Sequence, residues 1–148
     1  MSLIREIAMS TAVSVALSCF MVPMAQAEKM HDGAEQSQTV QAPAKFVKKS
    51  KSIRGDVRVE QRGDQQVIVF SDSFKARSGP DLKVFLSPQS IKSATGRNAT
   101  RGAIKLGELK TTKGAQEYVV PKGVDLAAYG SVLVHCEAYS VLWGGAAI

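Results

Sequence analysis

Cysteine and histidine are scarce in this sequence, which has two of each among its 148 residues. The Cys-x-x-Cys-His motif that attaches haem covalently is absent, and the few sulfur and imidazole groups form no tetrahedral zinc set. The Gly-x-Ser-x-Gly elbow of serine hydrolases is absent as well. The sequence therefore implies no metal site and no cofactor by motif, and it leaves open whether the protein is an enzyme.

Long hydrophobic runs are also lacking. The longest apolar stretch without charge, residues 7–22, has about 16 residues and stops before Pro23, whereas a membrane-spanning helix needs roughly 20. It follows Arg5 and precedes Ala25-Gln26-Ala27, the small-residue pattern that signal peptidase reads. We therefore expect a signal peptide over residues 1–27, cleaved after Ala27, a periplasmic or secreted protein, and no transmembrane span in the mature chain. The stretch ending at Cys19 resembles a lipobox, but its leucine is one place off, so lipidation is not expected.

Aromatic residues make up only 6% of the chain, and the cations are not interleaved with them as in proteins that bind single-stranded nucleic acid. The formal net charge is +6, with basic residues scattered among acids, so no nucleic-acid partner is predicted. Between Lys92 and Lys113, however, six basic residues accompany one acid. This segment predicts a positive belt that attracts an anionic partner, with Arg97, Arg101 and Lys105 as candidate binding residues.

The rest of the chain has the composition of one globular domain, with 45% hydrophobic and 22% charged residues overall. Residues 28–52 are rich in Glu, Gln, Ser, Ala and Lys and have little to bury, so we expect a flexible, disordered linker. Residues 53–148 consist of short apolar runs between Gly, Pro and Asp signals. That spacing is typical of a mostly β domain, either an antiparallel β-sandwich or a small β-barrel.

Individual strands follow from alternation and turn residues. A hairpin is expected across Arg62-Gly63-Asp64, because Gly-Asp suits a tight turn with positive φ angles; this chemistry explains the tripeptide better than its likeness to a cell-adhesion motif. Further strands are expected over 82–87, 103–106, 118–120 and 131–146, with a long loop over 89–102. Asp125 is expected to open a helical turn over 126–129.

The last of these segments contains Cys136, which is the only cysteine left after cleavage at Ala27. An internal disulfide is then ruled out, and a lone thiol in an oxidising compartment is buried and inert, paired with another molecule, or used. Alternation places Cys136 on one face with small apolar residues, Val132, Val134 and Ala138. The opposite face carries Leu133, His135, Glu137 and Tyr139. The first face favours burial, whereas a redox thiol needs partial exposure and nearby positive charge.

Several pieces of residues 53–148 together resemble the DM-thirteen (electron transfer DM-thirteen) family. They are Gly79-Pro80-Asp81-Leu82 before an apolar strand, Leu106-Gly107-Glu108-Leu109-Lys110, Val124-Asp125-Leu126 with Tyr129, and the segment 132–146 around Cys136. The resemblance implies a mostly β extracytoplasmic domain whose family cysteine falls on Cys136, with a proposed role in electron transfer through it. His135 stands where the family commonly has an aromatic residue, so the resemblance gives it no role.

Two functional hypotheses follow. The first is an exported accessory protein with a redox or electron-transfer role centred on Cys136. Because no second cysteine completes a dithiol couple, this role needs the thiol of a redox partner protein, thiyl or sulfenic acid chemistry at Cys136, or a bound cofactor. The second is a noncatalytic extracytoplasmic β module that binds a partner protein or an anionic envelope surface through the positive belt. A noncovalently held haem or apolar ligand between the sheets is compatible with either, with His135 and Tyr139 as candidate contacts.

Overall fold

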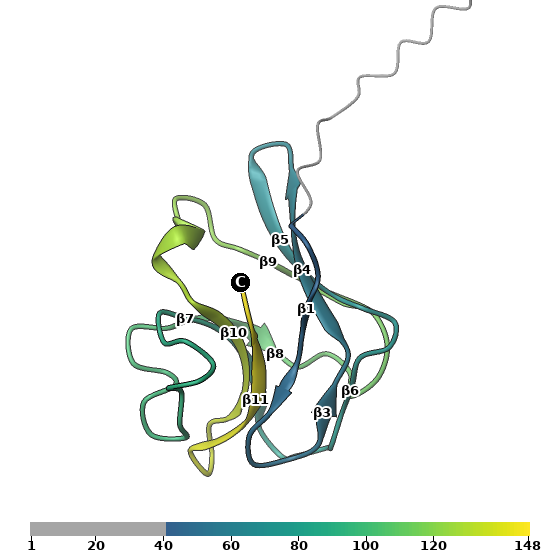
Figure 1. The fold of residues 1–148 in the computed structure, drawn as a ribbon, viewed down its shortest axis with the longest axis vertical. Helices are drawn as coiled ribbons and strands as arrows, with labels where there is room; N and C mark the ends of the chain where they lie inside the picture. Colours follow the sequence, from purple (N-terminus) through teal and green to yellow (C-terminus); the bar gives the residue numbers. More distant parts are fainter. Residues whose placement is uncertain (1–40) are drawn as a thin grey trace, which may run out of the picture. The chain divides into compact units, whose positions relative to one another are not determined.

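Two antiparallel β-sheets form the framework of residues 41–148, the part of the chain that the structure, a computed structural model, describes (Figure 1). The predicted signal peptide and residues 28–40 of the predicted linker lie outside these described residues. The elements in chain order are β1 (Ala44–Lys45), β2 (Val47–Lys48), β3 (Ile53–Arg54), β4 (Asp56–Arg62), β5 (Gln65–Phe70), β6 (Lys75–Ala76), β7 (Leu82–Ser87), β8 (Ile104–Glu108), β9 (Gln116–Val119), the 3-10 helix η1 (Leu126–Ala128), β10 (Ser131–Cys136) and β11 (Val141–Ala147).

The sheets pack as an unclosed sandwich. One has the strand order β1-β4-β5-β9 and the other β2-β11-β10-β7-β8, while β3 and β6 form a separate two-stranded ribbon. The mostly β prediction is confirmed, and the sandwich is the alternative that the structure adopts. Within residues 41–148, no helix has the length and apolar character needed to cross a membrane.

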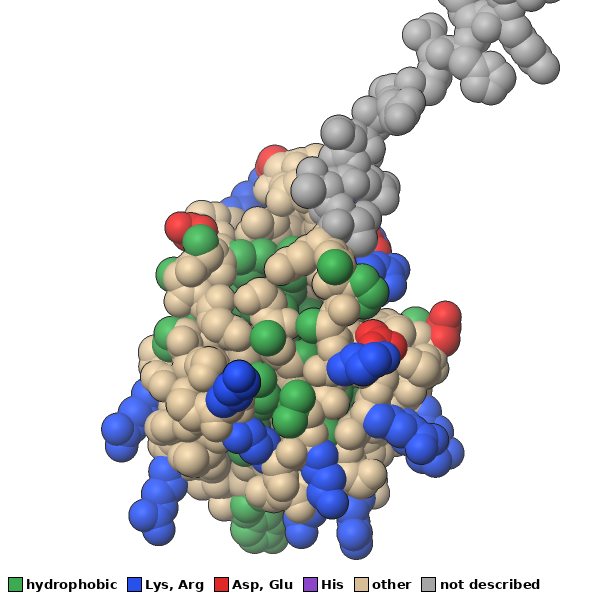
Figure 2. All heavy atoms as spheres, viewed as in Figure 1, with side chains coloured by type: hydrophobic (Ala, Val, Ile, Leu, Met, Phe, Trp, Pro, Cys, Tyr) green, Lys and Arg blue, Asp and Glu red, His purple; other side chains and the backbone are tan. Residues whose placement is uncertain are grey.

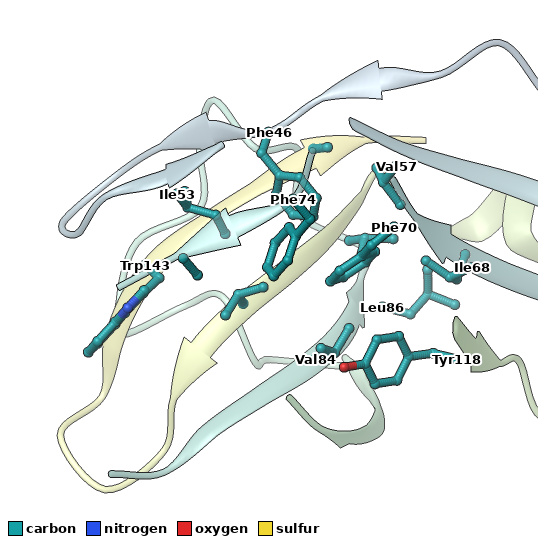
Figure 3. Packing of buried hydrophobic residues seen from close by; sticks show 14 of the residues in the cluster. Phe46, Ile53, Val57, Ile68, Phe70, Phe74, Val84, Leu86, Tyr118 and Trp143 are labelled. Atoms are coloured by element: carbon teal, nitrogen blue, oxygen red, sulfur yellow. The ribbon is translucent and has the colours of Figure 1, made fainter. Parts of the chain in front are cut away.

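The main hydrophobic core lies between the sheets and is centred on aromatic rings (Figure 3). Phe70 of β5 is fully buried, and its ring centroid lies 4.9 Å from that of Phe46, 4.8 Å from Phe74 and 5.3 Å from Tyr118. Among residues 41–148, the buried members of this core lie between Phe46 and Ala146, and Ala44 and Ile148 pack against it from either end of that range.

A second, smaller core covers the outer face of the β10 sheet. There Phe85 and Leu133 pack against Ile91, Ala94 and Ala99 of the long β7–β8 loop. The sheet is thus buried on both faces, which explains why all six residues of β10 are buried.

Most of the expected elements are present. Gly63 and Asp64 form the turn between β4 and β5, where Arg62 pairs with Gln65 and Gly63 has a φ of 62°. The strand predicted over 82–87 is β7. Asp125 caps η1 by accepting a hydrogen bond from the amide of Ala127 at 2.9 Å.

Two expectations need correction. The predicted linker extended to residue 52, but β1 pairs with β4, β2 pairs with β11, and Phe46 between them is buried. Its ring reaches the main core, so the folded domain begins before Ile53. The predicted alternation through Ala138 and Tyr139 also fails, because β10 ends at Cys136 and residues 137–140 form a turn.

Gly144 allows β2 to approach β11 closely. A Cβ atom at this position would lie closer to the carbonyl oxygen of Val47 and to Ile53 than van der Waals contact permits. We expect Gly144→Ala to lower the free energy of unfolding by roughly 1–3 kcal/mol, the usual range for overpacking, in urea titrations. Gly130→Ala is the matched control, since its new methyl group would have 3.4 Å to the nearest atom. Equal losses in both variants would contradict a specific close approach at Gly144.

Candidate functional site

Cys136 is the last residue of β10 and is fully buried. Its backbone pairs with Leu82 of β7 on one side and with Val141 of β11 on the other. Its side chain belongs to the main core together with those of Val132 and Val134, as the alternation predicts. Cys136 is a free thiol, and it is the one cysteine among the described residues.

The turn over residues 137–140 follows Cys136 directly, and Asp81 holds this turn in place. The amide of Glu137 donates to the backbone carbonyl of Asp81 at 3.1 Å, and the amide of Ala138 donates to Oδ2 of its carboxylate, also at 3.1 Å. The amide of Ser140 closes the turn by donating to the carbonyl of Glu137 at 3.2 Å. Asp81, which precedes Ala138 by 57 positions, thus fixes the end of β10, the strand that carries the thiol.

Ion pairs reinforce this contact. Lys83 Nζ pairs with Asp81 Oδ1, lies 3.5 Å from Glu137 Oε2 and 3.6 Å from Glu108 Oε1, and its side chain is only 13% exposed. Lys105 Nζ lies 3.2 Å from Glu137 Oε2. We call this set, Asp81, Lys83, Lys105 and Glu137, the latch. Through the latch, the ammonium groups of Lys83 and Lys105 both pair with Glu137, the residue that follows Cys136.

Charge pairing shifts two ionisation equilibria in the latch. The hydrogen bond from Lys83 lowers the pKa of Asp81, and the same bond raises the pKa of Lys83. The contribution of Asp81 to the stability of the turn is therefore present above the ordinary pKa of an aspartate and is lost as pH falls through the lowered value. The contribution of Lys83 is present below the ordinary pKa of a lysine and is lost as pH rises through the raised value.

The lowered pKa of Asp81 predicts how the turn over residues 137–140 responds to acid. We expect hydrogen-exchange protection of the Glu137 and Ala138 amides, corrected for intrinsic exchange, to be level near neutral pH and to fall once Asp81 is protonated. NMR exchange measurements at a series of pH values would show this. Asp81→Asn should remove the acid-induced fall, and its persistence in that variant would assign the fall to other carboxylates.

A cavity of about 170 Å³ opens beside the latch. It is lined by Gly79, Pro80, Asp81, Leu82, Glu108, Leu109 and Thr112. Because Leu82 is the backbone partner of Cys136, this opening lies next to the strand that covers the thiol.

His135 and Tyr139, the candidate ligand contacts, differ sharply in exposure. His135 is buried under the β7–β8 loop, where Nε2 donates a hydrogen bond to the carbonyl of Gly96 at 2.9 Å and the ring lies edge-on to Phe85. Its Nδ1 atom is buried without a hydrogen-bond partner among residues 41–148. Tyr139, in the turn, is 70% exposed. A ligand contact by His135 or Tyr139 stays a prediction.

The candidate belt residues also occupy different settings. Arg97 and Arg101 are exposed on the β7–β8 loop, whereas Lys105 of β8 is paired with Glu137 in the latch. Asp81 and Lys83 were not predicted as site residues, because the position of Asp81 after Gly79-Pro80 is typical of a turn residue. The available signal was a lysine inside the otherwise apolar strand 82–87.

The fold and the buried cysteine define a class, a small antiparallel β-sandwich domain with one thiol at the end of a central strand. A family model described as Electron transfer DM13 matches residues 45–148. The chain therefore belongs to the DM13, or DM-thirteen, family of electron-transfer domains, as the resemblance predicted. No curated protein and no solved structure matches the chain.

Proposed function

We propose that this domain is an electron-transfer accessory whose redox group is Cys136, exposed when the latch opens. The observation that carries the proposal is the placement of the thiol. It lies at the end of β10, directly before a turn that is held closed by two amide hydrogen bonds to Asp81, one to its carbonyl and one to its carboxylate, and by a few ion pairs. Such a turn opens at far lower free-energy cost than the sandwich unfolds.

The open state meets the chemical requirements of a reactive thiol. Lys83 and Lys105, released from Glu137, supply positive charge that favours the thiolate. The thiolate then attacks a disulfide of a partner protein: a bond forms between Sγ of Cys136 and one partner sulfur, the partner's S–S bond breaks, and its second sulfur leaves as a thiolate. Sγ of Cys136 is thereby oxidised to the disulfide level, and the leaving sulfur of the partner is reduced to a thiolate. Electron transfer is completed by a dithiol of a second partner protein: its first thiolate attacks Sγ and releases the first partner as a dithiol, and its second thiolate then breaks the new mixed disulfide, which frees Cys136 and leaves the second partner as a disulfide.

The urea dependence of thiol labelling tests this proposal. Cys136 in the full chain is alkylated over a range of low urea concentrations and read by peptide mass spectrometry, which separates it from Cys19. Local opening predicts a labelling rate that hardly changes with urea, because a turn exposes little surface. A rate that follows global unfolding, with its full urea dependence, would overturn the redox role.

The second candidate function is the noncatalytic β module that binds a partner protein or an anionic envelope surface. Complete burial of Cys136 favours it, because buried cysteines ordinarily act as small core residues. The same labelling experiment separates the two candidates: labelling only through global unfolding supports the binding module.

Export belongs to this proposal as well. We propose a periplasmic or secreted protein, based on the signal-peptide pattern of residues 1–27. N-terminal sequencing of the protein from its host should begin at Glu28, and an intact Met1 in the mature protein would contradict export by this route.

A further inference from the structure

Cationic side chains gather at the end of the sandwich that carries the β10–β11 turn. We call this surface the basic end and define it as Lys48, Lys49, Lys51, Arg54, Lys75, Arg77 and Lys92. Figure 2 shows lysine and arginine side chains projecting from this part of the molecule, with an exposed hydrophobic group among them.

Backbone contacts join these residues into one surface although they come from distant segments. The amide of Lys49 donates to the carbonyl of Trp143 in β11 at 2.9 Å, and its Nζ donates to the carbonyl of Lys92 at 3.0 Å. Arg54 pairs in register with Lys75 in the β3–β6 ribbon. The amide of Arg77 donates to the carbonyl of Ser52 at 2.8 Å. The cations therefore stay close together in the folded domain.

Their charges are not neutralised within the domain. Among residues 41–148, no carboxylate lies within 4.0 Å of a charged group of the basic end, whereas Lys45, Arg62, Lys83, Lys105 and Lys122 all have such partners. Clustered like charge weakens folding by repulsion but attracts anions. The basic end thus has the electrostatics of a binding surface for an anionic partner.

Exposed apolar side chains accompany the charge. Tyr139, in the β10–β11 turn, is 70% exposed, and Val47 of β2 is 47% exposed. The β7–β8 loop abuts this turn, because a Cβ at Gly96 would collide with the carbonyl of Ser140. Lys92 and Tyr139 thus belong to segments that meet at the same end.

We propose that the basic end docks on the surface of a lipid bilayer that contains anionic phospholipid. Five of its seven cations are lysines, compact charges that suit diffuse attraction to phosphate headgroups. Protein interfaces instead favour arginine and are depleted in lysine. Tyr139 and Val47 would enter the headgroup layer, where amphipathic rings and aliphatic side chains are stable. This inference does not depend on the redox role of Cys136.

Vesicle binding tests the inference. The chain from Glu28 onward retains all the residues of the two described cores, and it omits the apolar residues 7–22, which would themselves partition into lipid. Co-sedimentation is measured with phosphatidylcholine vesicles with and without phosphatidylglycerol. Binding should need phosphatidylglycerol and weaken with salt. The variant Lys51→Gln/Lys75→Gln should bind roughly tenfold more weakly, given the attraction of each lysine to an anionic surface.

The control variant Lys45→Gln/Lys122→Gln removes the same net charge from exposed lysines outside the basic end, and it should bind within about twofold of the wild type. If vesicle binding weakened equally in both variants, it would depend only on the net charge of the protein, and the proposal would be overturned. Binding to polyglutamate without binding to anionic vesicles would also overturn it, in favour of an acidic protein partner. Tyr139→Trp adds a direct readout, because brominated lipid should quench the introduced indole only if this turn enters the headgroup layer.

Discussion

Replacing Phe70 with alanine should lower the free energy of unfolding by about 4 kcal/mol. Phe70 is fully buried, and its ring contacts those of Phe46, Phe74 and Tyr118 at centroid distances of 5.3 Å or less. Alanine would lose the transfer free energy of the ring and leave a cavity where four segments meet. Neighbouring rings in a close-packed core can fill such a cavity only in part.

Urea titration followed by the fluorescence of the single tryptophan measures this loss. Val119→Ala is the control, because Val119 is 51% exposed in β9 and its truncation should cost less than about 0.5 kcal/mol. A loss below about 1 kcal/mol for Phe70→Ala would mean that the aromatic cluster is not part of the cooperative core.

The same cluster shows what could be predicted from the sequence. Val57 and Val59 of β4 alternate with polar residues, and the apolar run of residues 67–70 in β5 follows a Gly-Asp turn, so the β4–β5 hairpin is a local feature. Phe46 was missed because its segment offers only two apolar residues, and its burial depends on β1 and β2 joining opposite sheets. The turn after Cys136 has no glycine or proline; Ser140 adopts the positive φ of 52° instead. Local patterns give no sign of such a turn.

The latch and the basic end escaped prediction for a related reason. Lys105 and Glu137 are 32 residues apart, and Asp81 and Ala138 are 57 apart, so their contacts depend on strand order. The predicted belt joined cations that are close in sequence. The structure instead joins Lys49 to Lys92 through a contact spanning 43 positions and pairs Lys105 with an acid. The buried position of Cys136, by contrast, followed from simple alternation within one strand.

Asp81→Asn should raise the alkylation rate of Cys136 in the folded chain by roughly tenfold or more, because labelling requires the turn over residues 137–140 to open. Asparagine keeps the size of the side chain and its backbone carbonyl still accepts from Glu137. It loses the negative charge that pairs with Lys83 and weakens the acceptor for the Ala138 amide. The closed turn is destabilised, whereas the sandwich core, which Asp81 does not enter, is left intact.

Glu108→Gln is the matched control for this variant. Glu108 also pairs with Lys83, but its Oε1 lies 3.6 Å from Nζ and its side chain is 84% exposed. Because solvent screens such an exposed ion pair, it contributes little to stability. Its removal should change labelling by less than about twofold. Asp81→Asn should lower the free energy of unfolding by no more than the roughly 1.4 kcal/mol that corresponds to a tenfold change. Its labelling rate should still hardly depend on urea, which separates turn opening from global unfolding. If Asp81→Asn labels Cys136 no faster than Glu108→Gln does, the latch does not control access to the thiol. A gated redox role for Cys136 would then have no structural basis.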